Sequence, residues 1–536
     1  MTNIEKVRPK NTYEEVVLTF KAGLNTHVRH MEIDLDECLE GENFALGETH
    51  HHGTFRRRRP FDLVATAPIA SAVSGYGQKV NTDGSVSTLI QVGSTVYSWD
   101  GASTFTSVGT VLAGTKLRGP RQSNFTLDGY VIMTDLAKID VVKKWDGTTF
   151  SDLAHNLGTT FIAKYCRVSN ERAFFANVMA GGVDTPHVIL GSALDDAQDL
   201  TTTDRPSSAL STADPFFIPM PNLRPINGLE EAFGQFIIST ERDLLYRLSG
   251  QDATDFAMES FYQGSAVAGD EAIANIGNDV ILASQGRIET LSGTLNFGDV
   301  ETNDVSRWIA GEVSGAGSWT VVYDRRYQKV LCFPDDQGAV WVLHKTLLNS
   351  PDNASLLSPW SKWTTTHALS FQPTCVMPLI DPTTGTDAIY MGDSTGNIYR
   401  LDGDGGQDGG TADVTVSRTS GIARTALDQV YGVSGWIQYH KQFAATVTLT
   451  FEFSGVATPD QVITIPIPAN DQVGVYGGGS WYGLGTYYGG GFHGKLFRRD
   501  FRVAGRASQV QVTVEVEGEQ DVEIEEVGIR FHGAET

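Results

Sequence analysis

Three aspartates in a glycine-rich segment are the first candidates for chemistry. Asp402, Asp404 and Asp408 stand in the run Asp402-Gly-Asp-Gly-Gly-Gln-Asp-Gly-Gly410, and calcium prefers several carboxylate oxygens together. No glutamate follows at the spacing that an EF-hand loop requires. We therefore keep calcium as a weak interpretation and predict that residues 405–410 are a Gly/Asp linker without a metal.

Histidine and cysteine give no better metal candidate. Neighbours in an extended segment point to alternate sides, so His50, His51 and His52 are expected to form an exposed polar turn. The four cysteines make no CxxC pair and no zinc spacing, which favours buried free thiols. We predict no metal and no cofactor.

Catalytic motifs give no stronger signal. No nucleophile elbow, HExxH helix, P-loop or paired-carboxylate signature stands out. Gly392-Asp-Ser-Thr-Gly-Asn-Ile-Tyr399 is similar to the Asp-box turn of sialidase propellers, where that turn is structural. Glycosidases need two carboxylates at a fixed separation, and no such pair can be named. We therefore predict no catalytic residue and no enzymatic activity.

The run Arg56-Arg57-Arg58-Arg59 is the one basic cluster in an acidic chain. One interpretation is contact with DNA phosphate. Docking on an acidic surface of a neighbouring subunit or ring is favoured over it, because arginine forks pair with carboxylates. A solvated face is as compatible with the sequence as docking. We predict that these four arginines dock the subunit.

An aromatic and glycine-rich segment at residues 476–492 is the most unusual part of the sequence. It combines aromatic side chains with a very free backbone. It is compatible with a partner-binding tip, a channel constriction, a sugar-stacking surface or an ordered loop on its own domain. The candidate residues are Tyr476, Trp481, Tyr482, Tyr487, Tyr488 and Phe492.

Composition limits the class of protein. The 536 residues suggest two or three domains, and 40% hydrophobic with 19% charged residues is a globular balance. No apolar run is long enough to cross a bilayer, and the first residues lack the apolar core of a signal peptide, so we expect folding in the cytoplasm of the producing cell. The net charge of −24 makes general nucleic-acid binding unfavourable, although an acidic wall could line a conduit along which DNA slides.

A repeat indicates the fold. Short runs rich in valine, isoleucine, threonine and aromatics alternate with glycine and aspartate turns, as in sandwiches and propellers. Trp99-Asp-Gly101 and Trp145-Asp-Gly147 each end a strand with an Asp-Gly turn, and the two tryptophans are 46 positions apart. That spacing is close to one four-stranded propeller blade. Weaker repeats of the same pattern, two strands around a polar turn, follow along the chain. We therefore predict a propeller of roughly six to eight blades over residues 61–404.

Two further segments flank the predicted propeller. Long alternating strands such as Val447–Phe453 and Val510–Glu517 predict a C-terminal β-sandwich at residues 411–536. Residues 1–60 are expected to form an N-terminal docking arm. The predicted fold class is therefore all-β, with an arm, a propeller, the linker and a sandwich.

The order of several motifs resembles one family, the nozzle proteins of short-tailed bacteriophages, which are similar to tail tubular protein B and are also called phage stabilisation proteins. Each motif is loose, and their order along one chain is more specific. The segments are Gly41-Glu-Asn-Phe44, Gly53-Thr-Phe-Arg-Arg-Arg-Arg-Pro-Phe61, Ser192-Ala-Leu-Asp-Asp196, Ile226-Asn-Gly-Leu229, Glu241-Arg-Asp-Leu-Leu-Tyr-Arg-Leu-Ser-Gly250, Gly277-Asn-Asp-Val-Ile-Leu282, Gly286-Arg-Ile288, Trp360-Ser-Lys-Trp363 and Gly392-Asp-Ser-Thr-Gly-Asn-Ile-Tyr399.

The resemblance implies a structural protein of the virion tail. It implies a ring of six copies below the head–tail adaptor or connector, with contacts to tail fibres or spikes. Genomic DNA would pass transiently through the axis of the ring, retained before ejection and then released. Repulsion by the acidic charge would keep that DNA mobile.

Two other functions remain open from the sequence. A non-catalytic receptor- or glycan-binding tail protein would use Trp481 and Tyr482 to stack on sugars. A polysaccharide-degrading propeller enzyme would depend on a single essential carboxylate.

Overall fold

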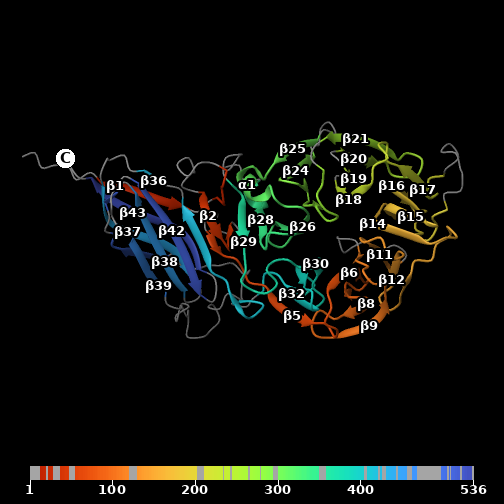
Figure 1. Cartoon of the computed structure of the whole chain (residues 1–536), viewed down its shortest axis with the longest axis horizontal. Coiled ribbons are helices and arrows are strands. Elements are labelled where there is room, and N and C mark those ends of the chain that lie inside the picture. Colours follow the sequence, from red (N-terminus) through yellow and green to blue (C-terminus); the bar gives the residue numbers. More distant parts are fainter. Residues whose placement is uncertain are drawn as a thin grey trace, which may run out of the picture.

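The computed structural model describes most of the chain. The described residues are 13–19, 22–27, 37–46, 55–119, 129–201, 211–232, 234–241, 244–263, 266–277, 279–293, 300–348, 358–403, 407–420, 423–424, 430–441, 445–454, 461–467, 497–503, 506–507, 509–518 and 522–533. They form a β-propeller and a β-sandwich that lie side by side (Figure 1).

The propeller consists of seven four-stranded antiparallel blades within the described residues. Blade 1 is β6 (Val73–Val80), β7 (Val86–Val92), β8 (Thr95–Trp99) and β9 (Phe105–Thr110), and blade 2 is β10 (Leu117–Arg118), β11 (Val131–Asp135), β12 (Lys143–Trp145) and β13 (Phe150–Asp152). Blade 3 is β14 (Phe161–Ser169), β15 (Arg172–Ala180), β16 (Val183–Gly191) and β17 (Phe216–Pro219), and blade 4 is β18 (Ile226–Ala232), β19 (Gln235–Thr240), β20 (Leu244–Ser249) and β21 (Ala257–Gln263).

The remaining blades close the ring. Blade 5 is β22 (Ile273–Asn275), β23 (Asp279–Ser284), β24 (Arg287–Gly293) and β25 (Val300–Asp304), and blade 6 is β26 (Trp319–Asp324), β27 (Lys329–Pro334), β28 (Val340–His344) and β29 (Trp360–Trp363). Blade 7 combines β30 (Cys375–Ile380), β31 (Asp387–Gly392) and β32 (Asn397–Arg400) with β5 (Asp62–Thr66) as its outer strand. Pairing of the first and last propeller segments protects the ring from opening at an edge.

Short helices occupy two connections of the propeller. They are η2 (Arg307–Ile309) and α1 (Ala310–Val313) between blades 5 and 6, and α2 (Lys345–Leu348) after β28.

The Trp-Asp-Gly repeat has the structural role that its sequence predicts. Trp99 and Trp145 end the third strands of blades 1 and 2 and are buried. Gly101 and Gly147 follow at φ values of +86° and +106°, which glycine adopts without steric cost. The all-β propeller prediction is confirmed by this strand order.

The sandwich is built from both ends of the chain. One sheet contains β3 (Phe44–Leu46), β4 (Phe55–Arg57), β43 (Val522–Gly533), β37 (Val430–Lys441) and β40 (Phe497–Phe501), with β1 (Tyr13–Thr19) on β43 and β41 (Arg506–Ala507) on β37. The other contains β2 (Cys38–Glu42), β35 (Val416–Ser420), β42 (Gln509–Gly518), β38 (Ala445–Ser454) and β39 (Gln461–Ile467), with β36 (Ala423–Arg424) on β42. In Figure 1 the red β1 and β2 lie among the blue strands.

This arrangement differs from the expected independent N-terminal arm. Strand β1 pairs with β43 from Tyr13–His532 to Thr19–Glu526, and β2 pairs with β35. Backbone groups buried in a sheet need partners, and the N-terminal strands supply them. The propeller is therefore an insertion between two parts of one sandwich.

One hydrophobic core joins the two domains. Phe44, Val416 and Val514 of the sandwich belong to the same cluster of buried side chains as Val280 of blade 5 and Trp341 of blade 6. Burial of apolar surface is the main stabilising term in folding. A continuous core therefore opposes hinge motion between sandwich and propeller.

Candidate functional site

The first candidate site is the junction between propeller and sandwich, centred on Arg58. Its guanidinium donates to Asp408 through Nη1–Oδ1 at 2.8 Å and Nη2–Oδ2 at 2.5 Å. Both side chains are fully buried. The guanidinium also lies over the ring of Phe371, at 5.0 Å from its centroid. This is the two-point geometry that arginine favours with carboxylates.

Asn43 completes the hydrogen bonding of this junction. Its Oδ1 accepts from Arg58 Nε at 2.8 Å and from the Thr364 backbone N–H at 2.8 Å. Its Nδ2 donates to Thr415 O at 3.1 Å. The φ of +60° places Asn43 in the left-handed region, which asparagine tolerates better than most residues. One side chain thus connects the N-terminal segment, blade 6 and the start of the second sandwich segment.

A second buried pair lies in the propeller next to this junction. Lys329, at the start of β27, is fully buried and its Nζ lies 2.7 Å from Asp402 Oδ2. The ammonium also faces the ring of Trp363 at 4.6 Å. Lys329 was not predicted as a site residue from the sequence. Its position at the start of the apolar strand Lys329-Val-Leu-Cys-Phe333 could have indicated a buried lysine that needs a counter-ion.

These contacts correct the interpretation of the Gly/Asp segment. Asp402 and Asp408 bind cationic side chains, and Asp404 lies outside the described residues. Gln407–Asp408 forms the short strand β33, which pairs with β34 (Ala412–Asp413). No group of three metal-ligating side chains gathers in the part of the chain that the structure describes. Asp408 thus forms part of a folded contact between the two domains, in a segment for which the sequence predicts a Gly/Asp linker.

The arginine run also differs from its prediction. Arg56, Arg57 and Arg58 are buried within the chain, at 5%, 7% and 1% exposure. Arg57 Nη1 donates to Val414 O at 3.3 Å. A buried side chain cannot dock on a neighbouring subunit, and Arg57 and Arg58 contribute to the junction instead. Arg59 is half-buried and its guanidinium lies over the ring of Tyr327.

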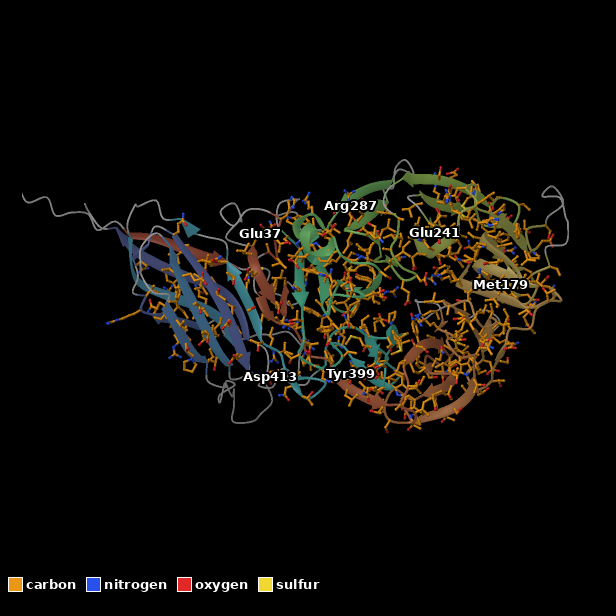
Figure 2. The ribbon with its side chains drawn as sticks, viewed as in Figure 1. Glu37, Met179, Glu241, Arg287, Tyr399 and Asp413 are labelled. Atoms are coloured by element: carbon orange, nitrogen blue, oxygen red, sulfur yellow. The ribbon has the colours of Figure 1, made fainter. Side chains whose placement is uncertain are left out.

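Figure 2 shows where the junction lies in the molecule. Glu37 and Asp413 are labelled on the boundary between sandwich and propeller, and Met179 lies at the far end of the propeller. Glu37 connects the two domains directly, since its Oε1 accepts from the Ser358 backbone N–H at 2.8 Å.

The second candidate site is the axis of the propeller. Arg118 of blade 2 reaches Glu271, just before blade 5, through two hydrogen bonds of 3.0 Å. Arg167 of blade 3 binds Glu230 of blade 4 at 2.9 Å. These ion pairs connect the inner strands, whose side chains converge on the axis of a propeller.

A polar cavity of about 350 Å³ lies beside these pairs. Its lining includes Lys116, Asp270, Thr320, Asp335 and Gln372. Asp270 is paired with Lys164 at 2.6 Å. The Arg118–Glu271 pair joins blade 2 to the segment before blade 5 at hydrogen-bond distance, which leaves no passage between them as wide as the major groove of a duplex, about 12 Å. Duplex DNA therefore cannot pass along the axis of a single propeller.

The glycine-flanked segment Gly392–Gly396 has the spacing of a nucleophile elbow but not its structure. It is the turn between antiparallel strands β31 and β32, whereas an elbow connects a strand to a helix. Asp393 Oδ1 accepts from the backbone N–H groups of Thr395 and Asn397, both at 2.8 Å. Burial raises the pKa of Asp393, but hydrogen bonds from Asn397 and Thr395 outweigh it and hold that pKa below its ordinary value. The carboxylate fixes the turn.

The remaining predicted residues lie outside the described residues. They are His50, His51, His52, Tyr476, Trp481, Tyr482, Tyr487, Tyr488 and Phe492.

No helix in the described ranges of the chain is long and apolar enough to cross a bilayer.

Comparisons with known proteins add little to this picture. No family model matches the chain, and no curated protein matches its sequence. Among solved structures, a structure described as YCF48 bound to D1 peptide has 12% identity and covers 64% of this chain and 95% of its own, with a TM-score of 0.39. The Pan2 WD40 domain of Neurospora crassa has 11% identity, covers 64% and 96%, and scores 0.39. The coronin WD40 domain of Toxoplasma gondii has 8% identity, covers 67% and 87%, and scores 0.36. At these scores the likeness carries no argument, and the propeller rests on the sheet topology.

Proposed function

We propose that this protein is a non-enzymatic structural component of the tail of a short-tailed phage. Several copies form the nozzle ring below the head–tail adaptor, line the channel through which DNA leaves, and help retain and then release the genome. The ring is expected to contain six copies and to contact tail fibres or spikes.

One observation carries this proposal. Three of the segments that resemble nozzle proteins meet at the junction, namely residues 41–44, the described part (55–61) of residues 53–61, and residues 360–363. Asn43 accepts from Arg58, Trp363 Nε1 donates to Phe44 O at 2.9 Å, and the Asn43 backbone N–H donates to Lys362 O at 2.8 Å. The motifs are loose individually, but they occur in the order typical of nozzle proteins, and three of them contact one another at one site. A fold shared with nozzle proteins explains this combination better than accidental similarity does.

The charge and the closed propeller axis are consistent with a channel between subunits. A net charge of −24 repels phosphate, so DNA would move along such a wall without adhering. Because ion pairs cross between blades at the axis of each propeller, the conduit has to be enclosed by several copies. The junction is rigid enough to keep the two domains of each copy in a fixed orientation.

Imaging of the tail in purified virions tests the proposal. We expect a ring of this protein beneath the connector, around a channel wide enough for duplex DNA. The purified protein should show no measurable binding to duplex DNA at physiological salt. Separate appendages on the tail periphery would overturn the nozzle proposal and would favour receptor or glycan binding.

A further inference from the structure

Exposed aliphatic side chains gather on one face of the propeller. In each antiparallel blade, the connection from the second to the third strand and the connection to the next blade lie on the same side, here called the upper face. Three connections of this face between blades 1 and 4, and the first residue of β16, each expose one large aliphatic residue, while the connection from blade 2 to blade 3 (residues 153–160) exposes none. These are Leu112, Ile139, Val183 and Leu223, at 56%, 43%, 65% and 66% exposure, and we call them the aliphatic arc.

Hydrogen bonds hold the connections of the aliphatic arc in place. The Leu112 backbone N–H donates to Asp140 Oδ2 at 2.9 Å. Lys138 Nζ donates to Asn177 Oδ1 at 2.7 Å and also pairs with Asp184. Asn177 Nδ2 donates to Ile226 O at 2.9 Å, which links blade 3 to blade 4. A surface that is already ordered loses less conformational entropy on binding than a mobile one.

Cationic side chains flank the aliphatic arc. Lys116 follows Leu112 and Arg224 follows Leu223, whereas Lys138, beside Ile139, is already paired with Asp184 of its own chain. In a chain with a net charge of −24, a partner that meets these cations has to present carboxylates.

The opposite face of blades 1 to 4, here called the lower face, presents carboxylates. Its turns expose Asp83, Asp100, Asp146, Glu171, Asp195, Asp196 and Asp255. No lysine or arginine occurs among the described residues of these lower-face turns. Leu194, at 41% exposure, stands beside Asp195 and Asp196, and the Asp195 backbone N–H donates to Glu171 O at 2.8 Å. Blade 3 thus combines an exposed leucine with three carboxylates on this face.

We propose that the aliphatic arc of one copy binds the lower face of blade 3 in a second copy of this chain. The contact is head-to-tail, with Val183 and Leu223 against the region of Leu194, and with Lys116 and Arg224 facing Glu171, Asp195 and Asp196. Such a contact uses two different surfaces and generates a closed ring when the rotation between copies closes. The inference rests on the proposed ring and names the surface that builds it.

Self-association of the full-length protein is the first test. Sedimentation over a range of concentrations should show association of the wild type, weakened by high salt. The double variant Val183→Asp, Leu223→Asp should raise the dissociation constant about tenfold or more, because it places charge in the apolar centre of the contact. Val462→Asp is the matched control, since Val462 is 61% exposed on strand β39 of the sandwich and should have no effect. Equal association of wild type and double variant overturns the proposal, and so does a wild type that stays monomeric at every concentration.

A charge exchange tests the direction of the contact. Arg224→Glu should weaken self-association, and Glu171→Arg should weaken it as well. A mixture of the two variants should associate more strongly than either alone, since both contacts between unlike copies then bring opposite charges together. A mixture that associates no better than the single variants contradicts the head-to-tail arrangement.

Zero-length carbodiimide cross-linking identifies the partner. In a mixture of copies with light and heavy nitrogen, Lys116 should cross-link to Glu171, Asp195 or Asp196 in peptides of mixed isotope content. In intact tails, cross-links from Lys116 to a different protein overturn this inference while an imaged ring still supports the nozzle. Images that show the protein as separate appendages on the tail periphery contradict both the nozzle proposal and this inference.

Discussion

Arg58 and Asp408 are 350 residues apart in the chain, and their side chains form a two-point ion pair from which solvent is excluded. Arg58 stands where the chain leaves the sandwich for the propeller, and Asp408 stands where it returns. Asp408 Oδ1 also accepts from the Phe61 backbone N–H at 3.1 Å, directly before the closing strand β5. One carboxylate therefore holds the entry and the exit of the inserted propeller together.

Replacing Asp408 should be strongly destabilising. Asp408→Ala leaves the Arg58 guanidinium buried without its counter-ion, and such a loss costs about 3–5 kcal/mol. Urea unfolding should show a lower midpoint. The matched control is Asp336→Ala, which removes an exposed aspartate and should change the free energy of unfolding by less than about 0.5 kcal/mol. Equal midpoints for both variants would mean that the pair does not hold the junction.

A methyl group at Gly23 should also disturb the junction. A Cβ at this position would lie 2.0 Å from the carbonyl oxygen of Trp360. Gly23→Ala therefore forces the N-terminal segment away from β29, at a cost of about 1–3 kcal/mol. Gly315→Ala is the control, because a Cβ there meets no heavy atom within 4 Å. Thermal unfolding compares the two, and an unchanged melting temperature for Gly23→Ala contradicts the predicted close approach.

The propeller was predictable because its signals are local. The strand ending at Trp99, the aspartate turn and the glycine at positive φ occur within a few residues and recur one blade later at Trp145. Except for β5 in blade 7, the strands of a blade follow one another in the sequence, so their pairings are between neighbours. A period in the sequence then predicts a period in the fold.

The junction was not predictable for the opposite reason. Strand β1 pairs with β43 at the other end of the chain, and no local pattern marks such a partner. Four consecutive arginines are normally exposed, since burial of a charge requires a counter-ion. The counter-ion of Arg58 lies in a glycine-rich run that predicts a linker. The pairing of Arg58 with Asp408 is visible only in the three-dimensional structure. From the sequence alone, the arginine run is compatible with a solvated surface, and the Gly/Asp run is compatible with a linker.

The aspartate of the blade 2 turn should give an acid-dependent contribution to stability. Hydrogen bonds from the backbone of Thr149 and Thr148 and from the Thr148 hydroxyl lower the pKa of Asp146 from 3.8 to about 2. A lowered carboxyl pKa stabilises the folded state at neutral pH, and this contribution disappears as the pH falls from about 4 towards 2. The difference in melting temperature between wild type and Asp146→Ala should therefore be larger at about pH 6 than at about pH 3. Asp336→Ala, which removes an exposed aspartate from the turn after β27, should show a smaller pH dependence, and the opposite order would contradict the assignment.

The four cysteines should be unreactive in the folded protein. Cys38, Cys166, Cys332 and Cys375 are all free and buried. Burial raises the pKa of Cys38 to about 11 and that of Cys166 to about 12, so little thiolate is present near neutral pH. Because the thiolate is the reactive form, a chromogenic disulfide reagent at about pH 8 should titrate four thiols after denaturation and none in the native protein. Ser94→Cys places a thiol on an exposed turn of blade 1 and should react at once, which controls for the reagent. A stoichiometric fast phase in the native wild type would show that one of the four sites opens, and peptide mapping would identify whether it is Cys38 at the junction.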